Sequence, residues 1–107
     1  MVASALLKAV QFWTDHGFGK FALHFLRDKQ KKEVDFVVVR DDEPWFLVEV
    51  KSSGKAALSP HLTYFQKQTA APHAFQVALN LPYVARDCFE VHQPIIVPAR
   101  TFLAQLV

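Results

Sequence analysis

Two strongly apolar segments, separated by a short acidic turn, constrain the fold more than any other feature of this sequence. Residues 34–39 and 45–51 carry β-branched and aromatic side chains on both faces, which is typical of strands inside a sheet. The Asp-Asp-Glu-Pro sequence at 41–44 forms a turn between them. The pattern therefore predicts two central antiparallel strands, with the rest of the chain built around one sheet.

Weaker patterns predict further elements on either side of this hairpin. In chain order they are a helix over 3–16, a strand over 21–26, a polar reversal at 28–32, a helix over 60–69, strands over 74–80 and 94–97, and a closing helix over 99–106. A helix between the third and fourth strands predicts a right-handed crossover, with the fourth strand parallel to the third. The expected fold is an α/β sandwich with a mixed sheet of four strands or slightly more.

Composition favours one domain over residues 1–107. Of the 107 residues, 51% are apolar, which is enough for a single core. No apolar run reaches the roughly 18 residues of a membrane span, so no membrane partner is expected. Cys88 is the one cysteine and favours a reducing compartment, hence a cytoplasmic protein. The net charge of +2 is too small to indicate nucleic-acid binding by itself.

Both central strands carry charged residues, which are costly in a covered strand unless they are paired, solvated or bound to a metal. They are Asp35 in the first strand, and Glu49 and Lys51, which share a face, in the second. A turn centred on Asp42 sets Asp35 opposite Glu49. A turn centred on Glu43 sets it opposite Lys51. A two-residue loop instead sends Asp35 to the other face.

Either turn of odd length predicts a cation site. Two carboxylates about 5 Å apart beside an ammonium group suit a hard divalent cation, Mg²⁺ or Mn²⁺, and the carbonyl of Val50 offers a further oxygen. Such an ion polarises a phosphoryl oxygen and activates a bound water, while Lys51 holds that water or neutralises charge on the phosphate. The competing interpretation is a solvated face with a cross-strand ion pair.

The spacing of these residues resembles a known group of nucleases. Asp35, thirteen intervening residues and then Glu49-Val50-Lys51 resemble the D…(D/E)-x-K core of the PD-(D/E)XK nuclease superfamily. Segments 32–36, 47–51 and 97–103 are similar to the nuclease-like C-terminal domain of uncharacterised prokaryotic AAA+ ATPases. The resemblance implies a restriction-endonuclease-like αβββαβ core and an ATPase domain upstream in a longer chain.

The resemblance also implies roles for single residues. Asp35 and Glu49 become metal ligands, and Lys51 becomes the catalytic lysine. The superfamily often places another acidic residue on the first helix, but residues 3–14 contain no Asp or Glu, and Asp15 follows at the helix end.

Further residues are secondary candidates for the same site. Glu33 has the strand parity of Asp35 and is a candidate ligand or supporting group, or else a surface charge. Gln66, on the predicted crossover helix, is a candidate because some superfamily members use a glutamine there, and its alternative is a surface position. Four lysines are candidate nucleic-acid contacts, or simply solvated loop residues. They are Lys29, Lys31, Lys32 and Lys55.

Two functions follow as hypotheses. The first is an Mg²⁺-dependent nuclease domain that hydrolyses phosphodiester bonds, DNA being the expected substrate, attached to an AAA+ ATPase. The second is a catalytically inactive module of the same fold that binds DNA or a partner, or that oligomerises. Exposed apolar residues would support self-association as a homodimer, and Phe12, Trp13 and Phe102 are the candidates.

Overall fold

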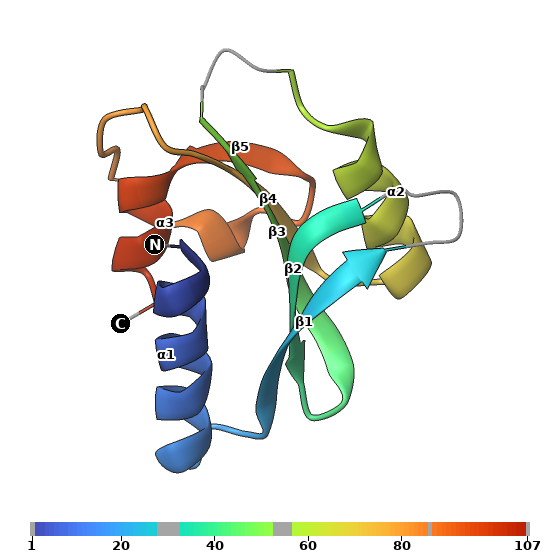
Figure 1. Ribbon diagram of the computed structural model, residues 1–107, viewed down its shortest axis with the longest axis vertical. Helices are drawn as coiled ribbons and strands as arrows, with labels where there is room; N and C mark the ends of the chain where they lie inside the picture. Colours follow the sequence, from blue (N-terminus) through green and yellow to red (C-terminus); the bar gives the residue numbers. More distant parts are fainter. Residues whose placement is uncertain (1, 28–32, 53–56, 86, 107) are drawn as a thin grey trace.

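The computed structural model describes residues 2–27, 33–52, 57–85 and 87–106, which fold as one sheet between two layers of helices (Figure 1). In chain order the elements are α1 (Val2–Asp15), β1 (Phe21–Arg27), β2 (Glu33–Arg40), β3 (Glu43–Lys51), α2 (Pro60–Thr69), β4 (His73–Ala78), the 3-10 helix η1 (Cys88–Glu90), β5 (Ile95–Pro98) and α3 (Ala99–Ala104). The expected α/β class is confirmed. Within the described ranges, no helix is both long and apolar enough to span a bilayer.

The sheet has the order β1-β2-β3-β4-β5. Strands β1, β2 and β3 are antiparallel neighbours, β4 joins β3 in parallel, and β5 joins β4 in parallel. The predicted parallel pairing of the third and fourth strands, with α2 between them in the chain, is therefore confirmed. The short strand after residue 93 extends the sheet to five strands. The polar reversal predicted at 28–32 lies outside the described residues.

Each face of the sheet has its own apolar core, which explains why the central strands are apolar on both sides. On one face, α1 and α3 cover a cluster that includes Leu6, Phe46 and Phe102. On the other, α2 covers a cluster that includes Leu47 and Phe65. Strand β4 lies between β3 and β5 and is buried at every position.

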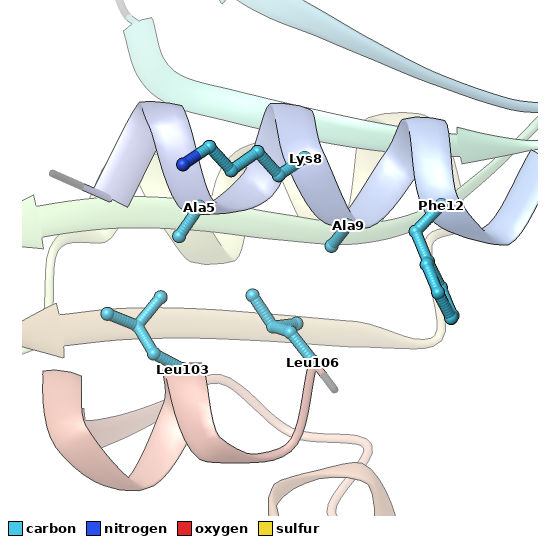
Figure 2. A pocket seen from close by; sticks show the side chains of 6 residues that line it. All are labelled: Ala5, Lys8, Ala9, Phe12, Leu103 and Leu106. Atoms are coloured by element: carbon cyan, nitrogen blue, oxygen red, sulfur yellow. The ribbon is translucent and has the colours of Figure 1, made fainter.

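A groove runs between α1 and α3 on the outer side of the first core (Figure 2). It has a volume of about 440 Å³ and an almost wholly apolar lining. Its lining residues are Ala5, Lys8, Ala9, Phe12, Leu103 and Leu106. The prediction of an exposed Phe12 is confirmed, because this side chain is 52% exposed. The prediction for Phe102 is wrong: its ring is fully buried against Phe46 and Phe75. Trp13 is half-buried and packs on the core.

The β2–β3 turn differs from either predicted centre. Its two residues, Asp41 and Asp42, have φ of 51° and 70°, and both lie in the left-handed region that two-residue hairpin turns require. Asp41 is held there by the N–H of Lys20, which donates to its Oδ1 at 2.8 Å. Because this turn has two residues, parity alone would send Asp35 away from Glu49.

A bulge at Trp45 reverses that parity. Val39 pairs with Pro44, yet Val38 pairs with Phe46, so Trp45 is an extra residue in β3. The bulge turns the rings of both Trp45 and Phe46 toward the α1 face, where they contact each other and Phe89. Beyond the bulge, Phe36 pairs with Val48. The pairing ends there, and one further step of the same register would set Asp35 across from Glu49, as a turn centred on residue 42 predicts.

Candidate functional site

A second bulge changes the direction of the Asp35 side chain. His24 pairs with Val37 but Leu26 pairs with Val34, so one residue of β1 faces both Asp35 and Phe36. Strand β2 therefore reverses its faces here. Val34 is buried in the same α2-side cluster as Val37, although the two are an odd number of residues apart.

Asp35 consequently faces the α1 side of the sheet. It lines a shallow hollow of about 270 Å³ on the α1 face with Val2, Phe36, Val50 and other apolar residues. The N–H of Val50 donates to its Oδ2 at 2.7 Å. Asp35 thus faces away from Glu49 and Lys51, the outcome predicted for a two-residue turn, although the structure reaches it through two bulges and not through turn parity alone.

Glu49 and Lys51 do share a face, as predicted. Leu47 packs in the α2-side cluster, whereas Val48 and Val50 pack on the α1 side, so the alternation of β3 turns Glu49 toward the α2 side. The Nζ of Lys51 lies 3.6 Å from Oε1 of Glu49. Asp35 reaches this pair only through Val50, the residue between them.

Glu49 is the most unusual polar residue of this region. Only 8% of it is exposed, although it carries a carboxylate in the middle of the sheet. Its Oε2 is buried and has no hydrogen-bond partner among the described residues. Lys51, with a side chain that is 40% exposed, provides a partly solvated counter-charge for the other oxygen only. A buried carboxylate oxygen without a partner is costly unless a cation or another donor binds it.

Gln76 lies beside Glu49. It is not among the site residues predicted from the sequence. The parallel register pairs these two residues, and Gln76 is fully buried in β4. Its Oε1 accepts from the N–H of Ser59 at 2.7 Å, and its Nε2 donates to the carbonyl of Ala57 at 3.0 Å. The available signal was a glutamine inside an otherwise apolar strand, the same signal that singled out Asp35.

The predicted helix start at Pro60 is confirmed. Ser59 occupies the cap position with an extended backbone, and its side chain makes no capping bond. The Ser59 N–H is instead held by Gln76. A residue of the sheet, rather than the cap hydroxyl, therefore fixes where α2 starts.

The structure gives Gln66 contacts away from Glu49, and its accessory role stays a prediction. Its Nε2 donates to the carbonyls of Ala71 at 3.2 Å and His92 at 2.7 Å, next to the start of β4. His73, which opens β4, pairs with Phe46, three residues before Glu49 and so roughly 10 Å along the strand. Gln66 thus fastens the far end of α2.

Several other candidates lie outside what the structure describes. The side chain of Glu33 is one of them, although its backbone pairs with Arg27 in the sheet. The lysines proposed as nucleic-acid contacts are the others. They are Lys29, Lys31, Lys32 and Lys55. Their roles stay predictions.

The described residues thus bring together two carboxylates, one ammonium group and the Val50 backbone, with the two acids on opposite faces. In the described part of the chain, no three or more His, Cys, Asp and Glu side chains are grouped so that they could hold a metal ion. The chemistry available is that of one buried carboxylate, its lysine neighbour and a second carboxylate held at the intervening peptide.

The fold and these residues define a class: an α/β domain with the order α-β-β-β-α-β and a charged cluster at one end of its central strands. A family model described as a domain of unknown function, DUF4143, matches residues 1–97. The chain belongs to this family. A search of curated proteins and a search of solved structures gave no match.

Proposed function

We propose that this domain is a divalent-cation-dependent phosphodiesterase of the PD-(D/E)XK kind, acting on nucleic acid, with DNA as the expected substrate. The buried carboxylate of Glu49, with one oxygen lacking a partner among the described residues, carries the proposal. Family membership adds support, because DUF4143 domains are associated with AAA-ATPase-linked proteins. An ATPase domain elsewhere in a longer cytoplasmic chain is part of the same proposal.

The residues present fit Mg²⁺ or Mn²⁺. Oxygen ligands are the ones both ions prefer, and Oε2 of Glu49 is an oxygen for which the described residues supply no donor. Glu49 and the carbonyl of Val50 would hold the ion, and Asp35 would add an oxygen after turning from the α1 face toward them. The N–H of Val50 already keeps the Asp35 carboxylate beside the Glu49-Val50-Lys51 segment. Bound there, the ion would polarise a phosphoryl oxygen and activate water.

Lys51 has a separate part in the proposal. Its ammonium group lies 3.6 Å from Glu49 and its side chain is 40% exposed, so a substrate phosphate can approach it from solvent. A positive charge at that place neutralises charge that builds up on the phosphate during attack. Glu49 orients the lysine, and the lysine offsets part of the cost of burying Glu49.

Melting with and without metal tests the cation site. A ligand that binds only the native state raises the melting temperature, and the rise grows with its concentration. We expect Mn²⁺ to raise it for the wild type and the rise to disappear in Glu49→Gln and to shrink in Asp35→Asn. Asp42→Asn is the matched control, because it removes an exposed carboxylate at the opposite end of the same hairpin.

Cleavage assays test the reaction. We expect plasmid or single-stranded DNA to be cut in the presence of Mn²⁺ and cutting to fall about 100-fold or more in Lys51→Ala, in line with the loss of one transition-state charge contact. In the melting experiment, the proposal is wrong if Mn²⁺ raises the melting temperature of Glu49→Gln as much as that of the wild type.

A second candidate function is favoured by the direction of Asp35. With its carboxylate bonded to Val50 and lining the α1 face, the domain resembles an inactive module that keeps the fold without cutting. The apolar groove between α1 and α3 then serves as the contact surface, and a second copy of the chain would bury the exposed ring of Phe12.

Light scattering separates this second candidate from the first. A binding module predicts a concentration-dependent dimer that Phe12→Ser converts to a monomer, with no cleavage of DNA by either protein. Leu79→Ser is a suitable control, because Leu79 is also exposed, at 43%, but lies outside the groove. A monomer at all concentrations would rule out self-association through the groove.

A further inference from the structure

Helix α2 is fastened at both ends by the amide group of a buried or half-buried glutamine. Near its start, Gln76 from β4 bridges the Ser59 N–H and the Ala57 carbonyl. Near its end, Gln66 from the helix itself bridges the carbonyls of Ala71 and His92. The two clamps use the same chemistry, but they lie at different distances from Glu49.

The Gln76 clamp is the one next to the candidate site. Gln76 and Glu49 are direct register partners in neighbouring parallel strands, so their side chains leave the sheet side by side on the α2 face. The segment that Gln76 holds, residues 57–59, therefore lies over this face beside the Glu49 carboxylate. Ser59 in that segment is itself buried.

Gln76 is the one polar residue between Ala74 and Ala78 of β4, which are otherwise apolar. An apolar side chain of similar volume would fill the same space but would leave the Ser59 N–H and the Ala57 carbonyl without this partner. The amide is tolerated because both of its polar atoms are satisfied. What it adds is a fixed position for residues 57–59 over the Glu49 side of the sheet.

We propose that Gln76 is a positioning residue for the cation site: it holds residues 57–59 against the α2 face and thereby fixes the enclosed surroundings in which Glu49 meets the metal. The inference rests on the proposed function and adds a residue to it. Residues that support metal ligands from the surrounding shell commonly change metal affinity by about 10–100-fold when they are replaced.

A pair of matched variants tests this role. Gln76→Met and Gln66→Met each remove two hydrogen bonds of one clamp while keeping side-chain volume. We expect the Kd for Mn²⁺, measured by calorimetry on the full chain, to rise about tenfold or more in Gln76→Met and to stay within about twofold in Gln66→Met. Gln76→Met should lower the melting temperature more, because Gln76 is fully buried whereas the Gln66 contacts are partly exposed, so both Kd values are measured well below the melting temperature of either variant.

A measurement on the wild type keeps the inference testable should Gln76→Met fail to fold. Coupling between two sites is reciprocal, so a clamp that favours Mg²⁺ binding must itself be favoured by Mg²⁺. Hydrogen exchange of the Ser59 N–H should therefore slow on addition of Mg²⁺. The Val84 N–H, held at 2.8 Å by Oγ1 of Thr101 on α3, is the control and should not change.

The outcomes separate the two proposals. If the wild type binds Mn²⁺ and both methionine variants bind it equally well, Gln76 has no positioning role while the cation site stands. Unchanged hydrogen exchange at Ser59 with Mg²⁺ bound would also exclude a positioning role for Gln76 and leave the cation site standing. If the wild type binds no Mn²⁺ at all, the proposed function fails, and the role of Gln76 fails with it.

Discussion

The Glu49 side chain combines two features that rarely occur together, a charge and nearly complete burial. Lys51 reaches one carboxylate oxygen at 3.6 Å, which is long for a strong ion pair, and its own side chain is partly exposed. The other oxygen has no partner among the described residues. Without metal, this residue is therefore expected to cost stability.

Replacing Glu49 by glutamine tests that expectation. A neutral amide is cheaper to bury than a charge, so Glu49→Gln should be as stable as the wild type or more stable in EDTA. A gain of about 1 kcal/mol would raise the melting temperature by roughly 4 °C in a domain of this size. Calorimetry in EDTA measures it. A clear drop would mean that the charge of Glu49 is well satisfied in the metal-free protein.

Individual residues show which parts of the site could be predicted from the sequence and which could not. The spacing of Glu49 and Lys51 fixed their common face, because alternation along an unbroken strand is obligatory. The direction of Asp35 could not be predicted, because the bulge at Asp35 and Phe36 leaves no signal in the apolar pattern. Gln76 could be noticed but not interpreted, because its partners lie 17 and 19 residues away.

At the level of elements, the β2–β3 hairpin decides which groups meet. Its two-residue turn and its bulge at Trp45 have opposite effects on strand parity, and together they set the register that pairs Phe36 with Val48, one residue before Asp35 and Glu49. Aromatic packing favours the bulge: the ring of Trp45 lies within 6 Å, centroid to centroid, of Trp13, Phe21, Phe46 and Phe89. The turn reverses the direction of the chain, and the packing of these rings holds Trp45 as the extra residue of β3.

The turn can be tested independently of the site. Asp42 has φ of 70°, which glycine adopts without cost and β-branched residues strongly disfavour. Asp42→Gly creates the favoured Asp-Gly pair and should stabilise the protein by about 0.5 kcal/mol, whereas Asp42→Val should cost more than about 1 kcal/mol. Urea denaturation measures both. Equal effects of the two substitutions would contradict a left-handed residue at this position.

The elements themselves were largely predictable. Long, β-branched runs predicted β2 and β3, and the helix predicted over 60–69 matches α2. The helix between β3 and β4 made the parallel pairing predictable, since a strand reached through a crossover returns in the same direction. The two bulges were not predictable, because each depends on packing between residues far apart in sequence.

At the scale of the whole molecule, the sheet separates two surfaces. The α1 and α3 side carries the larger core, the hollow beside Asp35 and the apolar groove. The α2 side carries Glu49, Lys51 and the two glutamine clamps. The two carboxylates thus belong to different layers and meet only at the peptide of Val50. The two carboxylates can bind the same metal ion only at the end of the hairpin where β2 and β3 separate, beyond the pair formed by Phe36 and Val48.

Locating Mn²⁺ by anomalous diffraction in crystals of the full chain tests the proposed cation site most directly. We predict a peak within coordination distance of a Glu49 oxygen, with Asp35 contributing a ligand from β2. Glu49→Gln crystals grown with the same Mn²⁺ should lack the peak. Bound Mn²⁺ found only elsewhere, with Asp35 still bonded to Val50 and no ion at Glu49, would contradict it.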